Sequence, residues 1–394
     1  MSQPLSEKTI SIIEATAPAV AGHIDEIVPC MYQRLLTDPE IRALFNMSHQ
    51  HGNSPQHKAL ASALVAYATH IRNPEVLGTA IERIAQKHAG LQILPEHYPH
   101  VGDALLGAVA EVLGDAITPE ILAAWGEAYW FLADILIGRE EQIYTSSEHA
   151  AGGWRGWRRF RVAAKTPETD EIISFLLEPV DGAAVQAHRP GQYLSFRFQP
   201  AEGEEYRRNY SISSAPNGQN YRITIKREPE GKISNWLHDS VEPGAEFDVA
   251  PPAGEFFLDP QGKSEIVLLS GGVGLTPMVS MLESFGGKEL PMLYVHATRD
   301  PRHHAMRERP LELASESHVF YETADESDLS APNTHAGRVN PEWLVQISDP
   351  KIADYFICGP TGFMDAMITG LKAANVPDNR IHYEFFGPAA AELG

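Results

Sequence analysis

His88 is the residue whose type and position most directly suggest chemistry. It lies in the stretch IERIAQKHAGLQILPEHY. Leu77, Ile81 and Ile84 precede it at helical spacing, so the imidazole shares one helical face with three apolar side chains. An imidazole there is either a core side chain bonded to a backbone carbonyl or a ligand of a metal or haem, because neutral imidazole is the commonest metal-binding side chain. This stretch alone leaves both interpretations open.

A second candidate site is the glycine-rich turn in EIVLLSGGVGLTPMVSMLESF. The pattern predicts a buried strand, a turn with Gly271, Gly272 and Gly274, and then a helix. The N-terminal amides of such a helix can bind a phosphate. The spacing is not that of the common G-x-G-x-x-G fingerprint, so a tight strand-to-helix turn without a ligand is the alternative.

Two other clusters have the residue types that a flavin cofactor requires. RRNYSIS places Arg208, Tyr210 and Ser211 along a predicted strand, which offers an aromatic ring for the isoalloxazine and two polar groups for phosphate. GKISNWLH places Gly231 and Ser234 at a predicted helix start, which is a further anion site. Each cluster by itself is more often an ordinary strand or helix cap.

The composition limits the class of protein and its partners. The chain has 394 residues, is 43% hydrophobic and 21% charged, and has a formal net charge of −21. So acidic a surface repels nucleic-acid phosphate and anionic lipid. We expect no membrane span and no signal peptide, because long apolar runs and a basic, apolar start are lacking. With only Cys30 and Cys358, no disulfide framework is implied, and a cytoplasmic location is expected.

Three segments must position these candidate residues. Residues 1–145 show apolar residues at helical spacing, with Asp38-Pro39, Asn73-Pro74 and Thr118-Pro119 as helix-start signals, and predict an all-α domain. Residues 146–153 read as a linker. Residues 154–262 contain short strands separated by turns, which predicts a small antiparallel β-barrel; the predicted strands include RRFRVAAKTP (residues 158–167), IISFLLEP (residues 172–179), GQYLSFRF and YRITIKRE. Residues 263–394 alternate the apolar strands EIVLLS, PMLYVHAT, HVFYETA and DYFICG with helices, which predicts an α/β domain with a parallel sheet.

The motifs RPGQYL, RRNYS, GKISNWL, SGGVGLTP and CGPTGFM occur in this order, and from about Trp154 onward the chain resembles the ferredoxin–NADP reductase superfamily. The resemblance implies an FAD-binding barrel followed by an NAD(P)-binding domain. The FAD contacts that it implies are Tyr193, Arg208, Asn209, Tyr210, Ser211, Gly231, Lys232, Ile233, Ser234, Glu384, Phe385, Phe386, Gly387 and Pro388. The implied nicotinamide-nucleotide contacts are Gly272, Val273, Gly274, Leu275, Thr276, Pro277, Cys358, Gly359 and Pro360. The family more often has cysteine at Phe385, which leaves stacking and hydride access there open.

The helical segment, taken with a reductase behind it, resembles the globin domain of flavohaemoglobins. This resemblance implies haem b with His88 as its proximal iron ligand. The implied distal pocket consists of Tyr32, Phe45, Gln56 and Leu60. His57 follows Gln56 and is expected to point about 100° away from it around the helix.

The resemblance also supplies partners for the proximal histidine. A ligating imidazole usually donates its other N–H to a neighbouring group, which fixes its tautomer. In the family, residues matching Tyr98 and Glu140 form this network, and the residue matching Lys87 is thought to tune the haem. Without the resemblance, Glu140 would be read as a surface acid and Lys87 as a solvated lysine.

The resemblance implies a nitric oxide dioxygenase. NAD(P)H gives hydride to FAD, FAD passes single electrons to haem, and O₂ bound at ferrous haem reacts with NO to give nitrate. Tyr32 would donate a hydrogen bond to the partly anionic oxygen, as in other preorganised electrostatic sites. A strongly donating set of His88, Tyr98 and Glu140 would push electron density toward the iron.

Two alternative functions remain open at this stage. One is a lipid or alkyl hydroperoxide reductase on the same haem, and the other is a non-enzymatic haem-based sensor or oxygen store. The expected partners are O₂, NO and NAD(P)H, with a lipid in the haem pocket as a further candidate, and a monomer is expected. The choice between NADH and NADPH is open, because Asp300 suits a ribose hydroxyl whereas Arg299 and Arg302 suit a 2′-phosphate.

Overall fold

The computed structural model describes residues 4–45, 55–202, 204–287 and 290–386, without the side chains of residues 55 and 56. The chain forms two compact units. One consists mainly of Met1–His149 and also takes in Ala201–Arg208, and the other consists of Ala150–Pro200 with Asn209–Phe386. Each unit is described by itself below.

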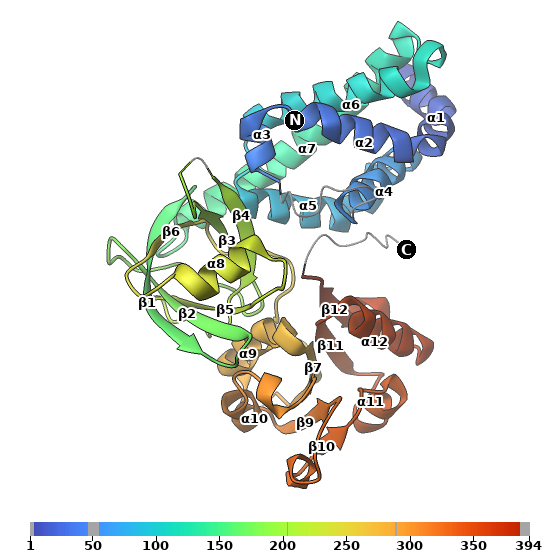
Figure 1. Ribbon diagram of the computed structural model, residues 1–394. Coiled ribbons are helices and arrows are strands. Elements are labelled where there is room, and N and C mark those ends of the chain that lie inside the picture. Colours follow the sequence, from blue (N-terminus) through green and yellow to red (C-terminus); the bar gives the residue numbers. More distant parts are fainter. Residues whose placement is uncertain (1–3, 46–54, 203, 288–289, 387–394) are drawn as a thin grey trace. The chain divides into compact units, whose positions relative to one another are not determined.

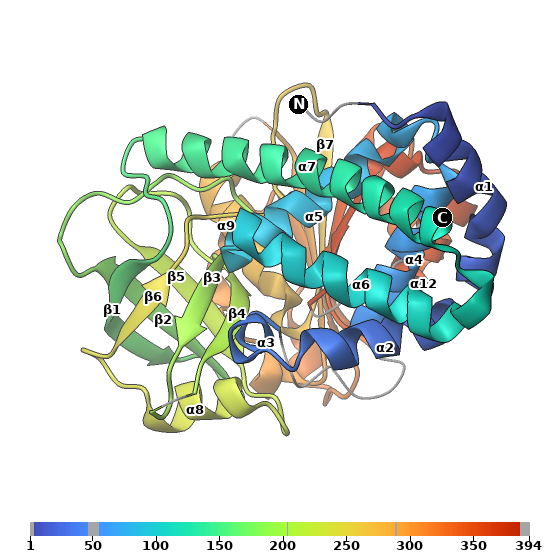
Figure 2. The same ribbon diagram turned by 90° about the horizontal axis from the view of Figure 1, so that it is seen from above.

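The described residues between 4 and 149, the main part of the first unit, are helical (Figures 1 and 2). Its α-helices are α1 (Glu7–Gly22), α2 (Ile24–Leu35), α3 (Pro39–Ala43), α4 (Pro55–Thr69), α5 (Gly78–Leu91), α6 (Tyr98–Leu113) and α7 (Pro119–His149). They enclose an apolar core to which α1, α2, α4, α6 and α7 all contribute buried side chains. This arrangement confirms the expected all-α domain.

The proline signals mark helix starts, although not all in the same way. The Asp38 carboxylate accepts hydrogen bonds from the first backbone amides of α3, and the Thr118 hydroxyl accepts one from Ile121 at the start of α7. Asn73 precedes a 3₁₀ turn, η2 (Pro74–Leu77), and makes no side-chain cap bond. Residues 146–149, expected at the start of a linker, instead continue α7.

Helix α7 is long and apolar enough to cross a membrane, judged by length and composition alone. Its buried residues include Trp125, Leu136 and Glu140, which face the interior of the helical unit. A core helix passes the same test, so this single helix is weak support for a membrane span.

The second unit begins with an antiparallel β-barrel. Its strands are β1 (Arg158–Pro167), β2 (Ile172–Pro179), β3 (Tyr193–Phe198), β4 (Tyr206–Ser211), β5 (Tyr221–Lys226) and β6 (Glu246–Val249). They form a sheet of order β4-β3-β6-β1-β2-β5. Ile212, directly after β4, pairs with Ile223 on β5 and so joins the two outer strands of the sheet. The helix α8 (Lys232–Ser240) follows β5. The predicted bounds of β1 and β2 agree with the structure.

The rest of the second unit is a parallel sheet with helices on both faces (Figure 1). Its strands are β7 (Glu265–Gly271), β8 (Met292–Thr298), β9 (Glu316–Tyr321), β10 (Thr334–Ala336), β11 (Ala353–Cys358) and β12 (Ile381–Glu384), in the order β10-β9-β8-β7-β11-β12. The helices are α9 (Leu275–Phe285), α10 (Glu308–Leu313), α11 (Pro341–Ile347) and α12 (Thr361–Ala373). The short strands β10 and β12 were not predicted.

The two faces of the sheet explain the unbroken apolar run in β7. Leu268 packs against α9, and its neighbour Leu269 packs on the opposite face against residues of α12. A parallel strand covered on both sides reads as continuous rather than alternating hydrophobicity. The expected fold class, an all-α domain followed by a β-barrel and a parallel α/β domain, is confirmed.

The strand order places a topological switch point between β7 and β11. After β7 the chain continues to β8 on one side, and it later returns to β11 on the other side. Ligands of such sheets bind at this switch point, outside the carboxyl ends of the strands. The two loops that leave these ends touch closely, since a Cβ on Gly274 would lie 2.2 Å from the Cys358 carbonyl oxygen.

We predict that Gly274→Ala destabilises the second unit by about 1–3 kcal/mol, the usual cost of overpacking. The backbone φ of Gly274 is −61°, so close approach and not left-handed geometry is the reason. Urea unfolding followed by tryptophan fluorescence measures the effect. Gly362→Ala is the matched control, because its Cβ would meet nothing within 4 Å. Equal stability of the two variants would contradict the prediction.

Candidate functional site

The first part of the site is a buried hydrogen-bond cluster around His88. His88 lies near the end of α5, Tyr98 is the first residue of α6, and Glu140 lies in α7. The His88 Nδ1 atom is 2.7 Å from Glu140 Oε1 and 3.2 Å from the Tyr98 hydroxyl. The Tyr98 hydroxyl donates to the same Glu140 oxygen at 2.6 Å. The structure therefore brings together three residues that are 10 to 52 positions apart.

Burial determines how this cluster behaves. Glu140 is only 1% exposed, and within the described residues its second oxygen, Oε2, has no hydrogen-bond partner. Burial and then the Glu140 charge raise the pKa of Tyr98, so its hydroxyl remains a donor. Because Glu140 Oε1 is an acceptor, His88 carries its proton on Nδ1 and keeps the lone pair on Nε2. A carboxylate partner of this kind orients a ligating histidine and raises its basicity.

These residues fit a haem. Among the described residues, the His88 Nε2 atom has no hydrogen-bond partner, and no group of three or more His, Cys, Asp and Glu side chains could hold a metal ion by itself. Ile81 and Ile84 pack beside Ala85 in the apolar cluster that also contains Tyr98. A single imidazole nitrogen beside an apolar wall is the donor set of a globin haem site. Such a group would be held by His88 Nε2.

Two of the expected distal residues, Tyr32 and Phe45, are in contact, and a histidine joins them. The Tyr32 ring is buried and meets Phe45 edge-on at 5.7 Å between ring centroids, and Leu60 packs against the same helical core. The side chain of Gln56 lies outside the described residues. His57, which is not among the expected distal residues, stacks on Tyr32 with ring centroids 4.3 Å apart. Its expected angle of about 100° from Gln56 stays a prediction.

The burial of His57 had a signal in the sequence. Leu60 and Leu64 follow it at the third and seventh positions, which places all three residues on one helical face. Leu60, Leu64 and Tyr67 all pack in the helical core, and His57 is 7% exposed.

Lys87, which precedes the proximal histidine, is half-buried. Its side chain makes no hydrogen bond or ion pair with the described residues.

The flavin candidates of β3 and β4 fall on two faces of their strands. Tyr193 is 8% exposed at the start of β3, and a Cβ on Gly254 would lie 2.8 Å from its ring. Ser195 donates to Asn209 Oδ1 at 2.9 Å, so these side chains share a face. Side chains alternate along a strand, so Arg208 and Tyr210 share one face of β4 whereas Asn209 and Ser211 share the other. The Tyr210 ring lies 5.8 Å from that of Phe196.

The start of α8 has the geometry of an anion site. Gly231 is the N-cap, and a Cβ there would lie 2.4 Å from the Ser234 hydroxyl oxygen. Ser234 accepts from the Glu228 amide at 3.1 Å and donates to the Gly231 carbonyl at 3.2 Å. Ile233 is buried, so only its backbone amide is available to a ligand, whereas Lys232 is exposed. The close packing around Gly231 fits a phosphate held by backbone amides.

The nicotinamide candidates meet at the switch point between β7 and β11. Gly272 has a φ of +52°, and a Cβ on it would meet nothing within 4 Å, so its backbone is open to a ligand. Val273, Leu275, Thr276 and Pro277 follow, and Leu275, Thr276 and Pro277 are buried at the start of α9. In the loop after β11, Gly359 packs directly on Gly271, since a Cβ on Gly359 would lie 3.0 Å from the Gly271 backbone. Pro360 is also close, because a Cβ on Gly271 would lie 2.8 Å from its ring.

The end of β12 lies close to both cofactor regions of the second unit. Glu384 pairs in register with Cys358, and its charge adds to burial in raising the pKa of both Cys358 and Tyr193. Phe385 packs edge-on against Tyr383 at 5.6 Å, and Phe386 is 45% exposed. Gly387 and Pro388 lie outside the described residues. Glu384 is therefore close enough to Tyr193 for its charge to act on the Tyr193 hydroxyl.

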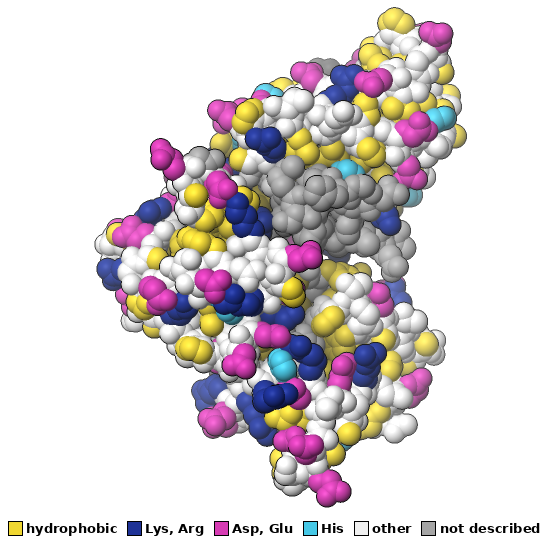
Figure 3. All heavy atoms as spheres, viewed as in Figure 1, with side chains coloured by type: hydrophobic (Ala, Val, Ile, Leu, Met, Phe, Trp, Pro, Cys, Tyr) yellow, Lys and Arg dark blue, Asp and Glu magenta, His cyan; other side chains and the backbone are white. Residues whose placement is uncertain are grey.

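The visible surface does not have a single sign of charge. In Figure 3, Lys and Arg side chains are interspersed with Asp and Glu over the face shown, despite the net charge of −21. A mixed surface leaves the recognition of anionic cofactors to local clusters.

Comparison with known protein families defines the class of protein. The globin family matches residues 30–136, an oxidoreductase FAD-binding domain matches residues 160–258, and an oxidoreductase NAD-binding domain matches residues 268–368. The expected cofactors, haem, FAD and NAD(P)H, agree with these three domains. The chain is an NAD(P)H-dependent oxidoreductase that carries a globin domain.

Whole-chain comparisons identify the family. The chain is 46% identical over 400 residues to a flavohemoprotein of Xylella fastidiosa, with 100% of both chains covered, and 45% identical over 399 residues to that of Rhizobium meliloti, with 98% of both covered. A flavohemoglobin of Malassezia yamatoensis, solved with FAD and heme, matches with a TM-score of 0.85 and 28% identity over 98% of this chain and 100% of that chain. The chain belongs to the flavohemoprotein family.

One further solved structure matches only the second unit. It is the FAD/NAD-binding domain of a nitric oxide dioxygenase from Vibrio cholerae O1 biovar El Tor, with a TM-score of 0.53 and 35% identity. The match covers 59% of this chain and 100% of that chain.

We predict that His88→Ala removes stable haem, because the His88 Nδ1 atom is hydrogen-bonded within the cluster and its Nε2 atom is the one that would bind iron. FAD should remain bound, because its candidate residues lie in the β-barrel. The ratio of Soret to flavin absorbance in the purified protein measures this. His100→Ala is the control, since this exposed histidine pairs only loosely with Asp38, at 3.5 Å. A His88→Ala protein with a normal five-coordinate haem spectrum would place the ligand elsewhere.

Proposed function

We propose that this chain is a nitric oxide dioxygenase that converts NO and O₂ to nitrate with electrons from NAD(P)H. The observation that carries the proposal is Glu140, a buried carboxylate that accepts hydrogen bonds from both His88 and Tyr98. A reversible oxygen store needs no more than a histidine bonded to a backbone carbonyl. A strongly hydrogen-bonded histidine is instead suited to oxygen chemistry, because a more basic axial ligand raises electron density at iron.

Different residues of the chain would hold the cofactors and orient the proximal histidine. When bound, haem supplies the iron at which O₂ and NO react, and FAD converts a hydride into single electrons that the iron can accept. Tyr193, Arg208, Ser211 and the start of α8 would hold FAD, and the turn at Gly272 would hold the nicotinamide nucleotide. Glu140 holds the proton on His88 Nδ1, and Tyr98 fixes the carboxylate by its own hydrogen bond.

The distal residues and two charged residues complete the proposal. Tyr32 is 5% exposed, so a hydrogen bond from its hydroxyl acts in a nearly water-free pocket on the negative charge that develops on the reacting oxygen. Gln56 would be a second donor there, with Phe45 and Leu60 as the apolar walls. Lys87, next to His88, and Glu384, near Tyr193, would tune the haem and the flavin through their charges.

The proposed activity has a defined stoichiometry. One NO and one O₂ need one electron to become nitrate, so one NADH should support two turnovers. The test is to add NO to aerobic protein with NADH and to measure nitrate and NADH together. Two nitrates per NADH support the proposal, whereas nitrite as the main product or no NO-dependent NADH consumption contradicts it.

A second candidate function rests on the same proximal cluster. An electron-rich axial ligand also favours cleavage of an O–O bond, as in other haem enzymes. A parallel assay with cumene hydroperoxide in place of NO separates the two functions. Faster NADH consumption with the hydroperoxide than with NO would favour a hydroperoxide reductase.

We predict that Tyr32→Phe raises the O₂ dissociation rate of the ferrous protein about tenfold to a hundredfold and lowers NO dioxygenation. A hydrogen bond to a charged acceptor contributes roughly 1.5 to 3 kcal/mol, and 1.4 kcal/mol is about tenfold. Stopped-flow O₂ dissociation measures the effect, and reduction of FAD by NADH should be unchanged. Tyr67→Phe is the matched control, because that buried hydroxyl bonds only the Ala128 carbonyl. Equal rates in the native and Tyr32→Phe proteins would show that the hydroxyl does not reach the oxygen.

A further inference from the structure

The loop after β8 combines two cations with a carboxylate at the place where a sheet of this kind recognises the adenosine ribose. Arg299, Asp300 and Arg302 directly follow the last residue of β8, Thr298. At this point an acidic residue binds the ribose hydroxyls of NADH, whereas an arginine accommodates the 2′-phosphate of NADPH. Sequence alone leaves both choices open, because both residue types are present.

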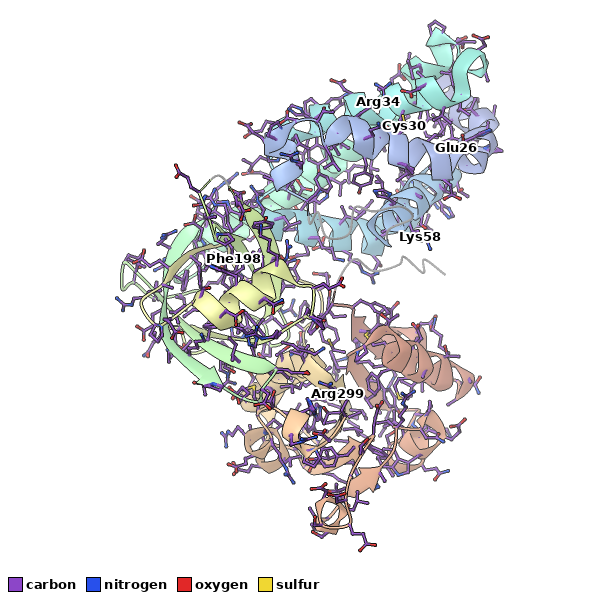
Figure 4. All side chains as sticks on the ribbon, in the orientation of Figure 1. Glu26, Cys30, Arg34, Lys58, Phe198 and Arg299 are labelled. Carbon is purple, nitrogen blue, oxygen red and sulfur yellow. The ribbon has the colours of Figure 1, made fainter. Side chains whose placement is uncertain are left out.

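A glutamate of the β-barrel, Glu171, forms an ion pair with the first of these arginines, Arg299. Glu171 directly precedes β2, and its carboxylate accepts a hydrogen bond from Arg299 Nη2 (Arg299 is labelled in Figure 4). His303 Nε2 lies 3.8 Å from the other Glu171 oxygen. The hydrogen bond from Arg299 lowers the pKa of Glu171 despite partial burial, so Glu171 is ionised at neutral pH. Arg299 is therefore already paired with a negative charge.

The position of Glu171 is fixed by its backbone and not by the ion pair. Its amide donates to the Thr169 hydroxyl at 3.2 Å, and its carbonyl accepts from the Arg227 amide at 2.7 Å. A substitution at this side chain leaves both bonds in place. Glu171 therefore belongs to the rigid wall of the barrel, and Arg299 reaches over to it.

The second arginine is also paired. Asp300 Oδ1 accepts from the Arg302 amide at 2.9 Å and lies 2.7 Å from His303 Nδ1. Asp300 Oδ2 accepts from Arg302 Nη2 at 3.2 Å. Burial opposes ionisation of Asp300, but the hydrogen bonds from His303 and Arg302 outweigh it and lower its pKa to about 2. The two arginines are thus balanced by two carboxylates.

We propose that Glu171 sets the choice between NADH and NADPH, because it pairs with the Arg299 guanidinium that a 2′-phosphate would otherwise bind. A phosphate monoester brings roughly −1.5 to −2 charge at neutral pH, so NADPH must displace Glu171 from Arg299 and is repelled by both carboxylates. A ribose 2′-hydroxyl brings no charge and can donate to Asp300 Oδ2. The barrel thereby acts on the specificity of the neighbouring nucleotide-binding sheet. This inference rests on NAD(P)H-dependent flavin reduction and does not require NO as the substrate.

The test is Glu171→Gln, which keeps the side-chain shape and removes the charge. We expect the KM for NADPH to fall about tenfold, equivalent to about 1.4 kcal/mol, with kcat and the KM for NADH unchanged. Ferricyanide serves as the electron acceptor, so the assay is independent of the haem. Because the pair is partly exposed, the gain should shrink as salt concentration rises. Glu178→Gln on β2 is the control, since Glu178 pairs with Arg161 at 3.4 Å in another exposed ion pair of the barrel.

A binding measurement separates specificity from turnover. Calorimetry on the full-length protein compares Glu171→Gln with the native protein. The variant should bind 2′,5′-ADP more tightly, and its affinity for 5′-AMP should be unchanged. Adding Arg299→Gln to that variant should abolish the gain, whereas Arg299→Gln in the native protein should leave the KM for NADPH unchanged. The proposal is wrong if Glu171→Gln leaves the NADPH-to-NADH ratio unaltered or strengthens both ligands equally. It is also wrong if the gain persists without Arg299.

Discussion

A buried carboxylate must be paired, and the haem side of this protein is organised around that requirement. Removing an ionised carboxyl from water is costly unless hydrogen bonds replace the solvent. Glu140 receives two, one from His88 on α5 and one from Tyr98 at the start of α6. Because both donors converge on one oxygen, three helices are tied together at the point where the imidazole must be oriented. The same bonds that stabilise the helical unit therefore also prepare the nitrogen that would bind iron.

The second unit meets a different constraint, which is close approach of backbone to backbone. The turn after β7 and the loop after β11 are so near that side chains larger than hydrogen do not fit at Gly274. This contact places the open backbone of Gly272 at the switch point of the sheet. Packing within the protein thus requires glycine at Gly274, whereas the open backbone at Gly272 is the part of the motif that a phosphate could approach.

Electrostatics in this chain act locally. The net charge of −21 describes the protein as a whole, but the candidate residues for binding anionic cofactors are helix amides, single arginines and their carboxylate partners. The pairing of Arg299 with Glu171 and of Arg302 with Asp300 shows that a basic residue near a binding loop is not by itself a free positive charge. Counting charges along the sequence cannot detect this, because Glu171 and Arg299 are 128 positions apart.

The sequence by itself determined whatever depends on local periodicity. It predicted the bounds of β1 and β2, the helical segment, the parallel sheet and the exceptional position of His88, because side-chain spacing reports directly which face of a helix or strand is buried. It missed the short strands β10 and β12, whose few residues become strands only because a neighbour pairs with them.

Only the tertiary structure decided the environment of the charged and polar residues. Glu140 sits in a polar run, GREEQ, that reads as surface, yet it shares a face with Leu136 and Tyr144 and is buried among other helices. His57 meets Tyr32 because α4 packs on α2 at that level, and Arg299 meets Glu171 because the barrel stands beside the sheet. Hydrogen bonds and ion pairs between distant segments depend on how the elements pack, and that packing is decided by the whole core and not by any local pattern.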